Sequence, residues 1–105
     1  LHAGTARPEK YWQADRWAAV AAHLHHRHGL AVVLTGSTAP EETAHLDAIR
    51  HQAGVPIHNV AGTSDLAGLA AVIAGARIFC GVDTAAMHLA DAVRTPTVAL
   101  FGPTN

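Results

Sequence analysis

The stretch Arg77-Ile78-Phe79-Cys80-Gly81-Val82-Asp83-Thr84-Ala85-Ala86-Met87-His88-Leu89-Ala90 joins an apolar run to a helical pattern. The run over 77–82 is continuous rather than alternating, which is typical of a strand buried on both faces of a parallel sheet. Asp83 can cap a helix, and Met87 and Ala90 follow it at the spacing of one helical face, which predicts a helix over 83–93. The stretch therefore predicts a strand, a turn and a helix, the repeating unit of an α/β fold.

The same alternation continues along the rest of the chain. Apolar runs predict strands over 31–35, 56–60 and 97–101, and residues 1–3 are interpreted as the remnant of a first strand. Helical patterns lie between them over 15–28, 40–53 and 65–76, with Gly29 as the stop of the first and Ser64-Asp65 as the start of the last. This order predicts one α/β domain over 1–105, a three-layer α/β/α sandwich with right-handed crossovers and a parallel, Rossmann-like sheet.

Each predicted helix carries one apolar stripe that we expect to face the sheet. The stripes consist of Trp17, Val20, Ala21 and Leu24; of Leu46, Ile49 and Ala53; of Leu66, Leu69, Ala70 and Ile73; and of Met87 and Ala90 with either Leu89 or Val93. The chain starts within a strand remnant and stops after the turn Gly102-Pro103-Thr104, where a helix normally covers a parallel sheet. We therefore interpret it as a fragment of a longer enzyme, truncated at both ends.

Composition excludes several classes of protein. Half of the 105 residues are hydrophobic and only 14% are charged, so the chain can bury a core and is not disordered. Seven Lys and Arg residues against eight Asp and Glu give a net charge of −1, without the basic surplus of a nucleic-acid binder, and no nucleic-acid partner is expected. One cysteine excludes a disulfide framework.

Metal and membrane interpretations are also disfavoured. The histidines between His23 and His28 have no carboxylate among them to complete a ligand set, so no metal site is expected. A signal-peptide pattern is absent, and the apolar stretch 66–82 is interrupted by Arg77, which favours a buried helix and strand over a membrane span. We expect a globular, cytoplasmic unit with at most peripheral contact with the inner face of a membrane.

Small and hydroxyl residues follow each predicted strand. These segments are Gly4-Thr5-Ala6, Gly36-Ser37-Thr38, Gly62-Thr63-Ser64, Asp83-Thr84-Ala85 and Gly102-Pro103-Thr104. Any α/β domain needs such residues for turns and caps, but their recurrence after every strand favours a ligand that carries phosphate, bound by backbone amides and helix N-termini. Neither G-x-G-x-x-G nor G-x-x-x-x-G-K-[ST] occurs, which disfavours NAD and P-loop nucleotide sites.

Two side chains are further candidates for that ligand. Lys10 is the only lysine beside six arginines, in a polar loop between the first strand and the first helix. A lysine kept in a sequence whose other cations are arginines indicates a need for a compact, mobile charge. His88 follows Thr84 and Ala85 by one helical turn and can lean towards the same ligand.

Several motifs resemble the heptosyltransferase family of glycosyltransferases, glycosyltransferase family 9. They are Gly4-Thr5-Ala6 with Lys10 and Trp12, Asn59-Val60-Ala61-Gly62, Asp83-Thr84-Ala85-x-Met87-His88-Leu89-Ala90, and Phe101-Gly102-Pro103-Thr104. The resemblance implies the C-terminal, donor-binding half of a GT-B enzyme, whose N-terminal half binds a glycolipid acceptor. It further implies transfer of heptose from ADP-heptose to lipopolysaccharide inner core, with inversion and without a metal or other cofactor.

The resemblance also assigns roles to individual residues. It places Thr5, Ala6 and Lys10 beside the donor diphosphate, Glu41 or, as second choice, Glu42 at the ribose, Thr63 and Ser64 in the adenosine pocket, and Asp83, Thr84, Ala85 and His88 at the diphosphate and sugar. Lys10 and His88 would stabilise the leaving group, whereas the general base would lie in the N-terminal half, so the fragment alone should bind donor without turnover. The chain departs from the family pattern at Ala3, Ala6 and Ala85, where the family has proline, a hydroxyl residue and glycine.

Alternative functions fit the same residues. One is another GT-B transferase that uses a different nucleotide sugar. A nucleotide-sugar epimerase is disfavoured because His88, rather than a glutamate, follows the Asp-Thr element. Another is an interaction module that kept the fold and lost the ligand, an alternative suggested by Ala6 and Ala85. Nucleotide binding distinguishes this module from the enzymes.

Overall fold

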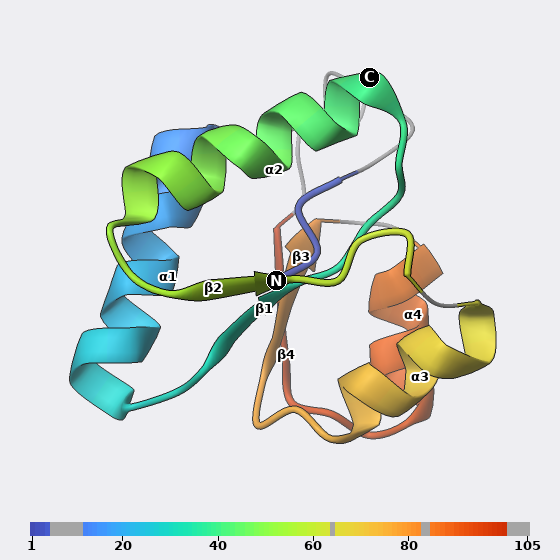
Figure 1. Cartoon of the computed structure of the whole chain (residues 1–105). Helices are drawn as coiled ribbons and strands as arrows, with labels where there is room; N and C mark the ends of the chain where they lie inside the picture. Colours follow the sequence, from blue (N-terminus) through green and yellow to red (C-terminus); the bar gives the residue numbers. More distant parts are fainter. Residues whose placement is uncertain (5–11, 64, 83–84, 101–105) are drawn as a thin grey trace.

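The computed structural model describes residues 1–4, 12–63, 65–82 and 85–100 (Figure 1). Within these residues helices and strands alternate as the sequence predicts, with bounds that differ by at most two residues. In chain order they are α1 (Ala14–His28), β1 (Val32–Leu34), α2 (Pro40–Ala53), β2 (Ile57–Asn59), α3 (Leu66–Ala74), β3 (Phe79–Val82), α4 (Ala85–Ala92) and β4 (Thr97–Leu100).

The strands form two parallel ladders. β1 pairs with β2 from Val32↔Ile57 to Leu34↔Asn59. β3 pairs with β4 from Phe79↔Thr97 to Val82↔Leu100. The parallel arrangement expected from the apolar runs is thus confirmed.

His2 joins the two ladders. It forms parallel bridges with Thr35 beyond β1 and with Gly81 in β3. The Leu1 amine donates to Val33 O at 2.7 Å, and the His2 N–H donates to Cys80 O at 2.8 Å. The segment around His2 is therefore a short central strand, in the order β2–β1–His2–β3–β4. With this segment counted first, that is the 3-2-1-4-5 order of a Rossmann-type sheet, and the order reverses at His2.

Two hydrophobic clusters lie on the two faces of this sheet. On the α1 and α2 side, Ala3, Trp17, Leu34, Leu46, Ile49, Cys80 and Val82 are buried together. On the α3 and α4 side, the cluster consists of Ile73, Phe79, Ala86 and Ala90. Figure 1 shows α1 and α2 on one side of the strands and α3 and α4 on the other. The predicted three-layer sandwich is confirmed.

The predicted start and stop signals act as expected. Gly29 ends α1 in the left-handed conformation, with φ of 64°, and its N–H donates to His25 O. Asp65 caps α3, because its side chain accepts a hydrogen bond of 2.9 Å from the Gly68 N–H. Trp12 packs edge-on against Trp17 at 5.1 Å between ring centroids, which anchors the start of α1 to the core.

Two apolar side chains depart from the expected burial. Leu66 is 71% exposed, so its predicted place in the α3 stripe is wrong; it is the first residue of α3 and lies outside the cluster that Ile73 joins. Val98 is 49% exposed although its strand was expected to be covered on both faces. Because Val98 is in register with Cys80, it points to the face of the sheet opposite α3 and α4.

Candidate functional site

The carboxyl ends of the parallel strands converge on one edge of the sheet. The bridges of His2 carry Ala3 and Gly4 between the Gly36 loop on one side and the end of β3 on the other. Ligands of open α/β sheets bind beyond this edge, at the point where the strand order reverses. In this chain that point is Gly4, the last described residue before the predicted polar loop.

Glu42 lies at this edge and is only 7% exposed. It comes from the first turn of α2, and its Oε2 accepts a hydrogen bond of 2.6 Å from the Ser37 N–H. A Cβ atom at Gly4 or at Gly36 would overlap the Glu42 carboxylate. A side chain at either position would therefore displace the Glu42 carboxylate, which lies between the end of the central strand and the loop after β1.

His2 and Thr35 lie in the sheet just before this edge. A hydrogen bond of 2.8 Å joins His2 Nδ1 to Thr35 Oγ1, and Thr35 is buried. Desolvation lowers the pKa of His2, and this effect outweighs the attraction of Glu42, which alone would raise it. His2 is therefore neutral near pH 7, and it acts here as a link between the central strand and β1.

The loop after β2 is attached to the loop after β1. Gly62 donates its N–H to Gly36 O at 2.9 Å and has φ of 73°, and a Cβ there would overlap Thr38 Cγ2. The Thr63 hydroxyl donates to Val60 O at 2.7 Å and is exposed. Thr63, predicted for the adenosine pocket, thus lies on a loop that is held against Gly36.

The two candidate glutamates differ in position. Glu41 is exposed, whereas its neighbour Glu42 is buried at the carboxyl edge. The sequence holds a signal for this difference, because the α2 stripe of Leu46, Ile49 and Ala53 extends back by one turn to Glu42 and not to Glu41. Glu42 was the second choice for the ribose, whereas the sequence analysis did not single out His2, since no local pattern shows that its strand is central in the sheet.

Ala85 and His88 lie one turn apart on the exposed surface of α4, and Ala85 is its first residue. The described residues therefore bring Gly4, the loops after β1 and β2, and Glu42 together at one edge. The other predicted site residues lie outside the described ranges: Thr5, Ala6, Lys10, Ser64, Asp83 and Thr84. In the part of the chain that the structure describes, no group of three or more His, Cys, Asp or Glu side chains could hold a metal ion.

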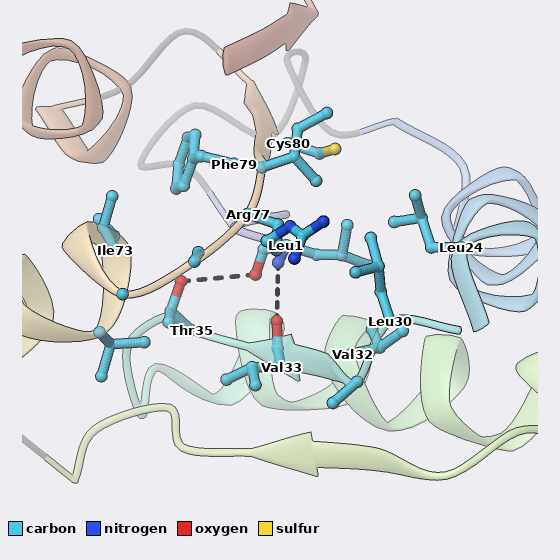
Figure 2. Close-up of a pocket in the computed structure, with 15 residues that line it drawn as sticks. Leu1, Leu24, Leu30, Val32, Val33, Thr35, Ile73, Arg77, Phe79 and Cys80 are labelled. Carbon is cyan, nitrogen blue, oxygen red and sulfur yellow. Dashed lines mark hydrogen bonds between the residues drawn. The ribbon is translucent and has the colours of Figure 1, made fainter. Parts of the chain in front are cut away.

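A cavity of about 330 Å³ lies at the opposite edge, near the amino ends of β1 and β3 (Figure 2). It is lined mainly by apolar side chains and includes the buried Cys80, whose pKa is raised by desolvation. Gly4, Glu42 and the described loops after β1 and β2 do not line this cavity, so it is distinct from the candidate site at the carboxyl edge. Among the helices of the described residues, none has the length and apolar character needed to cross a membrane.

The family model for glycosyltransferase family 9 (heptosyltransferase) matches residues 1–105. The chain is 40% identical over its whole length to lipopolysaccharide heptosyltransferase 1 of Pseudomonas aeruginosa, of which it covers 28%. It is 38% identical over 97 residues to lipopolysaccharide heptosyltransferase 3 of Escherichia coli, with 91% of this chain and 28% of that relative covered. The chain thus spans less than a third of the length of these relatives.

Solved structures are similar over the same region. A glycosyl transferase family 9 protein from Veillonella parvula matches with a TM-score of 0.88 and 31% identity, covering 99% of this chain and 29% of that one. The E. coli heptosyltransferase WaaC, solved with ADP, matches with a TM-score of 0.84 and 27% identity, covering 98% of this chain and 31% of that one. Fold, sequence and motifs agree, and the chain belongs to glycosyltransferase family 9, the heptosyltransferases.

Proposed function

We propose that this chain is the donor-binding domain of a longer GT-B glycosyltransferase that transfers heptose from ADP-heptose to lipopolysaccharide inner core. The names of its relatives support this activity, and a structure of the E. coli neighbour was solved with ADP-2-deoxy-2-fluoro heptose. The glycolipid acceptor would be bound by the remainder of the longer protein, at the cytoplasmic face of the membrane.

The observation that carries the proposal is the Glu42 carboxylate at the switch point of the sheet. One of its oxygens accepts from the Ser37 N–H, and the other has lone pairs for hydroxyl donors. A ribose offers two neighbouring hydroxyl groups of this kind. We therefore assign the ribose to Glu42 rather than to the exposed Glu41.

The diphosphate would lie beside Gly4, at the N-terminus of α4. An α-helix N-terminus favours an anion, and Ala85 begins this helix. Thr5, Ala6, Lys10, Asp83 and Thr84 keep the roles at the diphosphate that the family resemblance implies. The adenosine would lie towards Thr63 and Ser64, since the loop of Thr63 is fastened to Gly36 beside Glu42.

The reaction would be a single displacement with inversion. An acceptor hydroxyl oxygen attacks the anomeric carbon, the bond from that carbon to the diphosphate oxygen breaks, and ADP leaves with the electron pair. The hydroxyl proton passes to a base in the acceptor-binding half. Lys10, the α4 N-terminus and His88 would stabilise the charge that develops on the diphosphate, which lowers the barrier without a metal.

Calorimetric titration of the folded chain with ADP, and with UDP as the matched control, tests this function. We expect ADP to bind more tightly than UDP, because Thr63 and Ser64 would line the adenosine pocket, whereas the ribose assigned to Glu42 is common to both nucleotides. Preference for UDP would contradict an ADP-sugar donor while leaving a GT-B transferase in place. Absence of binding to either nucleotide by the folded chain would contradict a donor-binding role for these residues on their own.

A further inference from the structure

The loop after β2 extends beyond the ladder that β2 forms with β1. The ladder closes where the Val60 N–H donates to Leu34 O at 2.9 Å. Further along the loop, the Gly62 N–H donates to Gly36 O, also at 2.9 Å. The position of this loop at the carboxyl edge therefore depends on what Gly62 contacts.

The loop after β2 is held together by its own hydrogen bonds. Asn59 Oδ1 accepts from the Ala61 N–H at 3.0 Å. The Thr63 N–H and the Thr63 hydroxyl both donate to Val60 O, at 3.1 and 2.7 Å. Because these bonds lie within the loop, they fix its shape but not its distance from the loop after β1.

The loop after β1 is instead fixed to α2. The Ser37 N–H donates to Glu42 Oε2 at 2.6 Å, and Ser37 Oγ accepts from the Ala39 N–H at 3.3 Å. Ala39 O in turn accepts from the Thr43 N–H at 2.8 Å, in the first turn of α2. Thr38 lies between Ser37 and Ala39, so the backbone that carries Thr38 is held to the same turn as the Glu42 carboxylate.

The Thr38 side chain meets Gly62 across the two loops. A Cβ atom at Gly62 would overlap Thr38 Cγ2, so the methyl group of Thr38 occupies the place of the missing side chain. Gly62 has φ of 73°, in the left-handed region that favours glycine. Thr38 is nevertheless exposed, so burial in the core does not account for this contact. The contact adds a side-chain connection to the hydrogen bond between Gly62 and Gly36.

We propose that Thr38 is a positioning residue for nucleobase specificity, whose Cγ2 methyl group holds the loop of Thr63 at a fixed place relative to the Glu42 carboxylate. This inference rests on the proposed function, in which Glu42 binds the ribose and Thr63 lines the adenosine pocket. Base and ribose are parts of one nucleoside, so a base pocket adds affinity only when it is held at the distance that the nucleoside sets. A loosened loop would lose discrimination between bases, while the ribose and diphosphate contacts would remain.

Three variants of the chain separate the methyl group from the rest of the side chain. Thr38→Ser removes Cγ2 and keeps the hydroxyl, whereas Thr38→Val keeps a methyl group and replaces the hydroxyl. Thr43→Ser is the matched control, because it makes the same change at an exposed residue of α2. Calorimetry gives the ratio of the ADP and UDP affinities. Hydrogen exchange without nucleotide, at the Gly62 and Val60 amides, measures how firmly the loop is attached.

We expect Thr38→Ser to lower the preference for ADP over UDP about fourfold, which is the contribution of one buried methyl-sized group, with the UDP affinity unchanged. Exchange at Gly62 should become faster, and exchange at Val60 should not. Thr38→Val and Thr43→Ser should keep both the preference and the slow exchange. A purely structural role for Thr38 would lower both affinities together and leave their ratio unchanged.

An unchanged ratio in Thr38→Ser, an equal loss of ADP and UDP binding, or a loss of preference in Thr38→Val as well would each overturn the proposal. The unaltered chain distinguishes this failure from failure of the proposed function. If the unaltered chain prefers ADP and Thr38→Ser keeps that preference, only the role of Thr38 is wrong. If the unaltered chain has no preference for ADP, the proposed function is contradicted and the role of Thr38 with it.

Discussion

The carboxylate of Glu42 occupies the space that a side chain at Gly4 would need, although the two residues come from distant parts of the sequence. Gly4 ends the central strand and Glu42 lies in the first turn of α2, so their contact brings the end of that strand against the start of a helix. The Ser37 N–H, in the loop after β1, donates a hydrogen bond to the same carboxylate. This contact is the structural centre of the candidate site.

Replacement of Gly4 by alanine should destabilise the fold. The added methyl group would displace a buried, hydrogen-bonded carboxylate, and overpacking of this kind costs about 1–3 kcal/mol in the free energy of unfolding. Gly75→Ala is the matched control, because a Cβ there meets only ordinary contacts, the nearest at 3.6 Å. Urea unfolding measures both; equal stability of the two variants would show that the Gly4 contact is easily relieved.

The two glutamates of α2 give a direct test of the ribose assignment. Glu42→Gln keeps the shape of the side chain but removes its charge, so ADP affinity should fall by about 1.5–3 kcal/mol, the usual strength of a hydrogen bond to a charged group. Glu41→Gln should leave the affinity unchanged, because Glu41 is exposed beside it. Calorimetry compares the variants, and the reverse pattern would return the ribose to Glu41.

Lys10 is the main cation proposed for the diphosphate. Lys10→Ala should weaken ADP binding by about 1.5–3 kcal/mol, because a charged hydrogen bond to phosphate is lost. Arg27→Ala is the matched control: Arg27 is an exposed cation in the last turn of α1, away from the carboxyl edge. An affinity for ADP that falls equally in both variants would indicate general charge attraction instead of a specific contact.

The stability of the chain should fall as the pH falls below neutrality. The pKa of the Leu1 amine is about 6 in the folded state against 8.0 in the unfolded state, so the unfolded chain binds its proton first and stability is lost between pH 8 and 6. Desolvation also lowers the pKa values of His2 and His45 from 6.5, which extends the loss below pH 6.5.

Two modifications separate these contributions. Acetylation of the Leu1 amine should flatten the free energy of unfolding between pH 8 and 6, and His2→Gln should reduce the slope below pH 6.5. Chemical unfolding at a series of pH values measures both. If neither modification changes the slope of the free energy of unfolding against pH, desolvation of these groups does not cause the pH dependence of stability.

Much of this fold is readable from local sequence patterns. Apolar runs and helical stripes depend on neighbouring residues, so the strands, helices and caps at Gly29 and Asp65 could be predicted. The place of His2 at the centre of the sheet could not, because strand order depends on packing between distant segments. The exposure of Val98 likewise depends on which helix covers which face of the sheet.

The candidate site was predictable in its location but not in its detail. Five similar loops after parallel strands point to the carboxyl edge by topology alone. The choice between Glu41 and Glu42 depends on the direction in which α2 faces, and extension of the Leu46 and Ile49 stripe by one turn decides it. The contact of Glu42 with Gly4 is visible only in the folded chain, because no local sequence pattern indicates that these two distant residues meet.

Nuclear magnetic resonance of the chain during titration with ADP tests most directly where the nucleotide binds. The account predicts that the largest amide shift changes fall at the carboxyl edge, on Gly4, Gly36, Ser37 and Thr63, and that Leu30 and Ile78 beside the cavity change little. Changes concentrated on Leu30, Ile73 and Ile78, with Gly4, Gly36 and Ser37 unaffected, would contradict it.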